Sequence, residues 1–217
     1  MASNDLWLKR IRNYAGFLGM ILPWLSLLGA FIYSEFHALP SGFWSTLSIS
    51  ATYYITPPLT AVLTAASIVL MCYDGYDKRD SIITTLSGVF GIMIVIFPCD
   101  CSVSPDVVGF FQLPVHISNM IHCTAAVIFF LLLAYMSMFQ FTRTDVFNKD
   151  NVKKKQRNIV YRICAIGMLS AMILMPLPVY FFAKTFIIEA VALTFSGISW
   201  LVKGGAFTFL NDRLKHR

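Results

Sequence analysis

Two ionisable side chains, His122 and Glu189, lie inside long apolar stretches of the sequence. A charge in the middle of a bilayer costs roughly 3 kcal/mol on insertion scales, so such residues are functional candidates. Counted at 1.5 Å per residue from Val115 and Lys184, His122 lies at a depth of about 10 Å and Glu189 at about 7–8 Å. The matching depths predict that the two side chains can meet inside a helix bundle, where each would relieve the burial cost of the other.

Three polar residues precede His122 on the same stretch. Asn119 and Ser118 lie three and four residues before it and can share its helix face. His116 lies six residues before it, about 120° around a helix, so the two histidines are not a same-face ligand pair. We therefore take His122, Glu189, Asn119, Ser118 and His116 as the candidate ligand-binding residues of a polar pocket.

Several chemistries fit a His–Glu pair at this depth. It can work as a general acid and base, carry a proton, bind a ligand, or simply lock two helices together. His122 and Glu189 are the candidate catalytic residues, but the sequence has no nucleophile elbow, phosphate-binding loop or zinc-protease helix. A zinc site with three histidines is excluded because only His116 and His122 lie near an apolar stretch. We expect no metal and no cofactor.

Cysteines and aspartates between the apolar stretches offer weaker signals. Cys99 and Cys101 share one connection with Asp100 and Asp106, near the mouth of the expected pocket. A disulfide across one intervening residue would be strained, which favours free thiols or pairing elsewhere.

Three aspartates are spaced by three in another connection, at Asp74, Asp77 and Asp80. Spaced carboxylates can hold a hard cation, but this connection lacks the twelve-residue calcium pattern. A charged turn with Asp80 capping the next helix is favoured.

The elements that position these residues are membrane helices. The chain has 217 residues, of which 57% are apolar and 13% charged, and its mean hydropathy is +0.69. A soluble domain is about one quarter charged, because a water-facing surface needs charges. No alternating strands of a membrane barrel appear. The net charge of +6 does not indicate nucleic-acid binding, because the basic residues lie at the ends of the apolar stretches and form no groove-binding motif.

The fold class is all-α, a polytopic bundle of six transmembrane helices forming a single membrane domain over residues 1–217. Each apolar stretch is long enough to cross a bilayer or nearly so, and in hydrocarbon such a segment must be helical. The first stretch is expected to remain as a span rather than to be a cleaved signal peptide. The predicted spans are residues 15–33, 55–73, 82–97, 115–141, 159–182 and 186–202.

Lysine and arginine placement predicts the orientation. Basic residues cluster before the first span, after the second and fourth, and in the tail, whereas the other connections carry only Lys184. Basic connections face the cytoplasm, so both termini are expected to be cytoplasmic. The basic segment Lys149–Arg162 also suits anionic headgroups, at about 1 kcal/mol per residue, although topology setting explains it equally well. The cell membrane (plasma or inner) is favoured over an internal membrane.

The stretch from Val115 to Phe130 resembles the Frag/DRAM superfamily, which comprises damage-regulated autophagy modulators, GPI-anchor-remodelling proteins and bacterial members of unknown function. Their fourth helix opens with a histidine, then small residues and a phenylalanine, which His122, Ala126 and Phe130 match. Their last helix carries a lone acidic residue, which Glu189 matches. The resemblance covers most of the chain as architecture but rests on short motifs, and it implies a lipid-related role without naming a reaction.

These observations predict a lipid-interacting membrane protein, a non-enzymatic sensor or modulator of membrane state with its polar pocket in the outer half of the bundle. One alternative is a membrane enzyme that acts on a lipid or lipid-linked substrate through the His–Glu pair. A second is a proton-coupled small-molecule transporter with Glu189 as the carrier, although few other polar residues lie within the spans to form a path. Membrane lipids are the expected partners, nucleic acid is not, and a homo-oligomer or a membrane-protein partner stays open.

Overall fold

The computed structural model describes residues 2–73, 77–143 and 152–211. Over these residues the chain is mainly helical, which confirms the predicted helical class. The long apolar runs of the sequence form the helices, because a helix satisfies its own backbone hydrogen bonds without water. The α-helices of the described residues are α1 (Ala2–Phe36), α2 (Pro58–Met71), α3 (Lys78–Ile96), α4 (Val115–Tyr135), α5 (Val152–Leu174) and α6 (Lys184–Gly204).

Short elements complete the described fold. A 3-10 helix, η1 (Ser50–Tyr54), precedes α2, and a π-helix, η2 (Met136–Gln140), continues α4. Strand β1 (Val107–Val108) pairs antiparallel with β2 (Leu113–Pro114) in a small hairpin between α3 and α4. A last 3-10 turn, η4 (Thr208–Leu210), follows α6.

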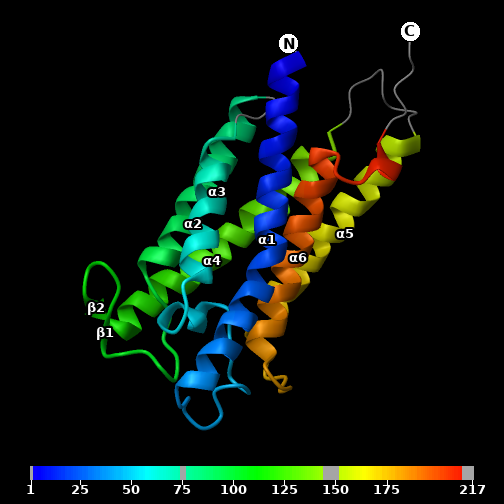
Figure 1. Cartoon of the computed structure of the whole chain (residues 1–217). Helices are drawn as coiled ribbons and strands as arrows, with labels where there is room; N and C mark the ends of the chain where they lie inside the picture. Colours follow the sequence, from blue (N-terminus) through cyan, green and yellow to red (C-terminus); the bar gives the residue numbers. More distant parts are fainter. Residues whose placement is uncertain (1, 74–76, 144–151, 212–217) are drawn as a thin grey trace.

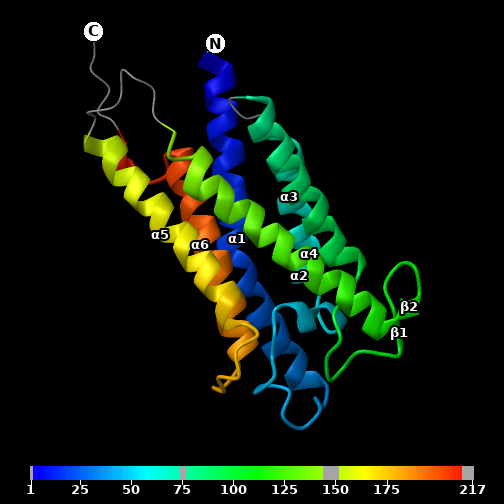
Figure 2. The ribbon, with the colours of Figure 1, turned by 180° about the vertical axis from the view of Figure 1, so that it is seen from behind.

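The helices pack side by side in chain order. Each of α1 to α5 contacts the next helix along the chain, and α6 contacts α1, which closes the ring. Figures 1 and 2 show the helices running along one long axis, with the start of α1 and the end of α6 at one end and the β1–β2 hairpin at the other. We call these the terminal end and the hairpin end.

Five helices of the described residues are long and apolar enough to cross a membrane. The exception is α2, whose 14 residues span about 21 Å at 1.5 Å per residue, against a hydrocarbon core of about 30 Å. Helix η1 precedes α2 in the chain and contacts it. Six crossings therefore stay a prediction.

Several predicted boundaries differ from the structure. Helix α5 ends at Leu174 rather than at residue 182, because Pro176 and Pro178 follow and proline supplies no backbone N–H. Helix α3 begins at Lys78 rather than at residue 82, and its cap was predicted wrongly. The side chain of Asp77, not of Asp80, caps it by accepting the Asp80 backbone N–H at 2.9 Å.

The segment before η1 is folded into the bundle, although the sequence suggested an outer connection. Phe43, Leu47 and Ile49 are each 2% exposed. The Ser45 carbonyl accepts the Ala183 N–H at 3.1 Å, and the Leu47 carbonyl accepts the Phe186 N–H at 3.0 Å. These bonds fasten an irregular segment along the first turn of α6 and place its next residues inside the hairpin end.

Glycines set the close approach of α1 to α6. A Cβ at Gly16 would lie 2.8 Å from the Gly197 carbonyl oxygen, and a Cβ at Gly197 would lie 2.7 Å from the Gly16 carbonyl oxygen. Both neighbours are backbone atoms that cannot rotate away. Small residues at such crossings let helix backbones pack closely.

We expect Gly16→Ala to lower the free energy of unfolding by about 1–3 kcal/mol, the usual cost of overpacking. Gly19→Ala on the same helix is the matched control, because its Cβ would find its nearest neighbour at an ordinary 3.6 Å. Thermal unfolding in detergent checks the pair. Equal losses of stability in the two variants would contradict the prediction that the close α1–α6 crossing leaves no room for a side chain at Gly16.

Candidate functional site

A polar cluster of Glu189, Ser50 and His122 occupies the hairpin end of the bundle. Glu189 comes from the second turn of α6, Ser50 begins η1, and His122 lies on α4. The Ser50 hydroxyl lies 3.2 Å from Glu189 Oε1 and 3.1 Å from His122 Nε2. His122 is 4% exposed. Ser50 thus joins the two residues that the sequence placed at matching depth.

The hydrogen-bond partners fix the number of protons in this cluster. His122 Nδ1 lies 3.1 Å from the Ile94 carbonyl oxygen and 2.8 Å from the Phe97 carbonyl oxygen. Carbonyl oxygens only accept, so Nδ1 carries a hydrogen. The two contacts of the Ser50 hydroxyl need two hydrogens, and the hydroxyl supplies one. The second belongs to Glu189 or to His122 Nε2, so the cluster is either neutral throughout or an ion pair across Ser50, with zero net charge in both cases.

The face of α4 around His122 holds the segment that leaves α3. The last carbonyls of a helix have no partner within the helix, and His122 Nδ1 serves the Ile94 carbonyl of α3 and the Phe97 carbonyl just after it. Ser118 donates to the Pro98 carbonyl at 2.8 Å. Asn119 Oδ1 accepts the Asp100 N–H at 3.1 Å. These side chains therefore have a structural task, since an unpaired backbone group in an apolar environment is costly.

Glu189 has a structural task of its own. Its Oε2 atom accepts the backbone N–H of Ile49, in the irregular segment that lies along α6. Non-helical backbone at membrane depth is tolerated only where protein or a water-filled cavity surrounds it. The carboxyl group thus holds Ile49 and Ser50 against α6, and this contact alone would justify an acidic residue here.

The cluster also borders a cavity. Ser50 and Glu189 form the polar part of the wall of a cavity of about 50 Å³, enough for roughly three to four water-sized groups. A second cavity of about 30 Å³ lies toward the terminal end, and the two cavities share the wall residues Leu22, Leu63, Phe129 and Leu193. Because they share wall residues, the two cavities form one apolar space between the helices, which we call the apolar seam. The polar cluster lies at the hairpin end of this seam. The remaining residues around the first cavity are apolar: Ile49, Leu59, Ile94, Ala126 and Phe130.

The structure sorts the predicted site residues into three groups. His122 and Glu189 come together, but through Ser50, because no ion pair joins them within the described part of the chain. Ser118 and Asn119 share the face of His122, as expected, and bind the segment after α3. His116 is exposed at the start of α4, away from that face.

Ser50 is the residue that sequence reasoning missed. The sequence gives its connection no basic residue and alternates Leu47, Ile49 and Ala51 with serines. That alternation is a signal of burial on one side. It did not indicate which helix the segment would meet, because the contact joins residues about 140 positions apart.

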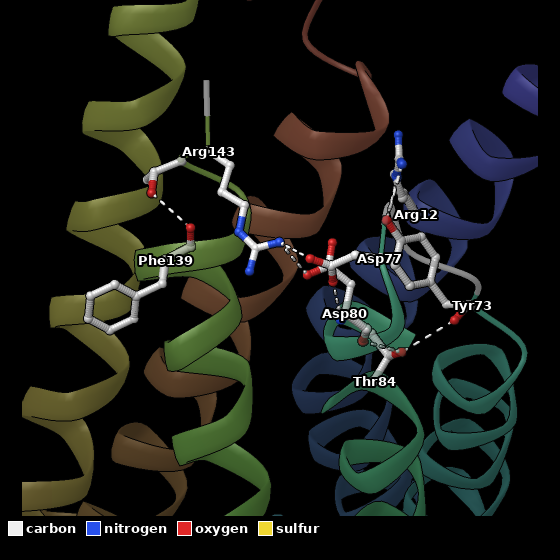
Figure 3. Close-up of polar contacts among 8 residues, drawn as sticks. Arg12, Tyr73, Asp77, Asp80, Thr84, Phe139 and Arg143 are labelled. Atoms are coloured by element: carbon white, nitrogen blue, oxygen red, sulfur yellow. Dashed lines mark hydrogen bonds and ion pairs between the residues drawn. The ribbon is translucent and has the colours of Figure 1, made fainter. Parts of the chain in front are cut away.

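A second polar group lies at the terminal end (Figure 3). Arg143 Nη1 lies 2.7 Å from Asp77 Oδ2 and 3.3 Å from Asp80 Oδ1. Arg12 donates to the Tyr73 hydroxyl from Nε and Nη2, at 3.2 and 3.1 Å. The contacts of Arg143 join the loop after η2 to the start of α3. Asp80 is buried there, whereas Arg143 is half-exposed. Asp74, from the predicted aspartate triplet, lies outside the described residues.

The pKa of Asp77 is lowered from its ordinary 3.8 by the Asp80 backbone N–H and then by Arg143. A lowered folded-state pKa stabilises the fold above the ordinary value, and this contribution is lost as the pH falls through the folded value. We therefore expect the unfolding temperature to drop below about pH 4, and Asp77→Asn to flatten part of that drop. A pH series of thermal melts checks this. Asp106→Asn, whose carboxylate makes no such cap, should leave the profile of the wild-type protein intact.

Neither the side chains of the described residues nor comparisons with known proteins assign a metal or a family. Among the described residues, no three His, Cys, Asp or Glu side chains are placed to hold one metal ion. Comparisons with protein-family models, with curated proteins and with solved structures find no match to this chain.

Proposed function

We propose that this chain is an integral membrane protein that binds a neutral, hydroxyl- or amide-bearing lipid at the Glu189–Ser50–His122 cluster. The observation that carries the proposal is the position of Ser50 and Glu189 at the head of an apolar seam between the helices. An apolar cavity with a few convergent polar groups is the usual form of a small-molecule site.

The membrane setting rests on the sequence and the packing together. The chain crosses the bilayer six times in this proposal, with η1 and α2 forming the second crossing. Lys78 begins α3 at the terminal end, where Arg12 and Arg143 also lie (Figure 3), whereas Lys184 begins α6 at the hairpin end. The positive-inside rule supports an orientation with both termini in the cytoplasm and the cluster in the outer half of the bundle.

The chemistry of the cluster selects the class of lipid. With zero net charge and a carboxyl group at its surface, the cluster offers no attraction to a phosphate. Its hydrogens are all used within the cluster, but the oxygens of Ser50 and Glu189 keep free lone pairs, which can accept a hydrogen from a lipid hydroxyl or amide group. The cavity is too small for a whole lipid, so the lipid lies between the helices and inserts only its head or one chain segment. The resemblance to the Frag/DRAM superfamily supports a lipid-related role, and a sensor or modulator of membrane state is the role that we favour.

Native mass spectrometry tests this function. The purified protein is exchanged into detergent with equal amounts of a diacylglycerol, a ceramide and a phosphatidylglycerol. We expect retention of a neutral lipid, with loss of that adduct in Glu189→Gln and in His122→Asn. A protein that retains no lipid, or retains all three equally in every variant, overturns the proposal.

A membrane acyl-transfer enzyme is the second candidate, because the Ser50 hydroxyl lies 3.1 Å from His122 Nε2. A serine paired with an imidazole is the arrangement of an activated nucleophile. Against it, the Glu189 carboxyl contacts the same hydroxyl, whereas a developing oxyanion needs hydrogen-bond donors. A lipid mixture incubated with the wild-type protein should stay unchanged. Product formation that Ser50→Ala abolishes would favour the enzyme instead.

A further inference from the structure

The loop between α3 and the hairpin carries a second group that neither the fold nor the lipid proposal uses. Cys99 and Cys101 are both free thiols, Cys99 buried and Cys101 half-buried. The two side chains lie one residue apart in the same turn, and the Ser104 backbone N–H donates to the Cys101 carbonyl at 3.1 Å. Because Cys99 is buried and Cys101 only partly so, Cys101 is the thiol that stays reachable from the surface.

The loop holds this arrangement from both sides. The Tyr54 hydroxyl of η1 donates to the Cys99 carbonyl at 2.6 Å, and Ser118 of α4 holds the preceding carbonyl. The Ser104 hydroxyl accepts the Cys101 N–H at 3.2 Å and donates to the Cys101 carbonyl at 2.8 Å. The dithiol thus belongs to a fastened turn, and the positions of its two sulfurs are set by the surrounding fold.

We propose that Cys99 and Cys101 form a thiol–disulfide exchange site at the hairpin end, with Cys101 as the attacking thiolate and Cys99 as the resolving thiol. The Cys101 thiolate attacks an external disulfide, forms a mixed disulfide and releases one thiolate. Cys99 then gives up its proton, attacks the Cys101 sulfur and releases the second thiol. In the net reaction the two cysteines lose two protons and two electrons, and the external disulfide takes up both and becomes two thiols.

Two properties of the pair suit this exchange. Hydrogen bonds from Cys99 and from the backbone lower the pKa of Cys101 to about 7, and the bond to Cys101 together with burial raises the pKa of Cys99. Attack is fastest for a thiol whose pKa lies near the ambient pH. A disulfide across one intervening residue is strained, and strained disulfides are the readily reduced ones. The product can therefore return to the dithiol.

The other titratable groups around the pair do not supply a positive charge. Asp100 lies in the same loop and raises the pKa of Cys101, Tyr54 faces the pair from η1, and Cys123 and Glu189 lie toward it from α4 and α6. The Tyr54 hydroxyl donates to the Cys99 carbonyl and so is a neutral donor. The lowered pKa of Cys101 is thus due to hydrogen bonds, of which the largest, from Cys99, can be removed by substitution.

Alkylation and oxidation test the proposal in a full-length background with Cys72→Ser and Cys123→Ser. The rate of iodoacetamide labelling at Cys101 should rise with a midpoint near pH 7. In Cys99→Ala the midpoint should move toward the ordinary thiol value of about 8.5. With oxidised glutathione, the parent protein should form the Cys99–Cys101 disulfide, whereas Cys99→Ala should stop at one glutathione on Cys101.

The result that overturns the proposal is an ordinary labelling midpoint in the parent protein together with the absence of any Cys99–Cys101 disulfide. Cys99→Ser serves if the alanine variant does not fold, because a hydroxyl keeps the donor to Cys101 and still cannot resolve the mixed disulfide. Lipid retention should be unchanged in both Cys99 variants, so this proposal and the lipid proposal can fail separately.

Discussion

Glu189→Ala is expected to lower the free energy of unfolding by about 2–5 kcal/mol, because it strands a buried backbone donor and opens a cavity. The Ile49 N–H loses its acceptor, and the Ser50 hydroxyl keeps only its contact with His122 Nε2. Each buried group left without a partner costs about 1–3 kcal/mol. Thermal and denaturant unfolding in detergent measure the loss.

Glu189→Gln is the matched variant for this prediction. The amide oxygen can accept the Ile49 N–H, and the amide nitrogen can donate to Ser50, which then donates to His122. This pattern copies the neutral form of the cluster, so the fold should lose no more than about 1 kcal/mol. If the glutamine variant is as unstable as the alanine variant, then the carboxylate charge itself holds the site, and the proton count derived above is wrong.

His122→Ala is expected to cost about 2–4 kcal/mol, because it removes the donor that serves the end of α3 and leaves a cavity in the bundle. The carbonyls of Ile94 and Phe97 would lose Nδ1. The same unfolding measurements check this value.

His122→Asn separates the two tasks of the histidine. The asparagine amide nitrogen can stand where Nδ1 stands and keep a bond to one carbonyl, but nothing replaces Nε2 beside Ser50. We expect most of the stability to return while lipid retention does not. Full lipid retention in His122→Asn would make the Nε2 contact irrelevant to binding and leave His122 as a helix cap alone.

The sequence predicted the apolar helices well, because the backbone of each long apolar run must form its hydrogen bonds within the run, as a helix does. It also predicted that His122 and Glu189 lie at one level, because helical rise converts residue counts into depth. It overran α5, since the apolar residues after Leu174 continue past the prolines that end the helix.

The parts that the sequence could not predict depend on long-range contacts. The burial of Ser50 depends on the pairing of residues 45 to 49 with the first turns of α6, which no local pattern encodes. The choice of Asp77 over Asp80 as the cap of α3 depends on backbone angles at the turn. The burial of Cys99 beside the more exposed Cys101 depends on a loop that η1 and α4 hold in place.

The polar cluster of the hairpin end therefore serves the backbone and faces a cavity at the same time. A structural clasp, by which we mean a cluster that only fastens the backbone, needs no more than the bonds to Ile49, Ile94 and Phe97. The Ser50 hydroxyl is the part that a clasp does not need, because no backbone group depends on its contacts with His122 and Glu189. Ser50 is thus the residue at which a ligand site and a structural clasp give different results.

The most direct test is the lipid-dependent thermal shift of Ser50→Ala compared with that of the wild-type protein, using diacylglycerol titrated into detergent. Without lipid the variant should lose about 1–3 kcal/mol, because Glu189 Oε1 and His122 Nε2 lose the hydroxyl between them while their backbone bonds remain. Its affinity for the lipid should fall about tenfold, the effect of roughly 1.4 kcal/mol of lost hydrogen bonding. An unchanged lipid shift in Ser50→Ala would contradict the account and make the cluster a structural clasp.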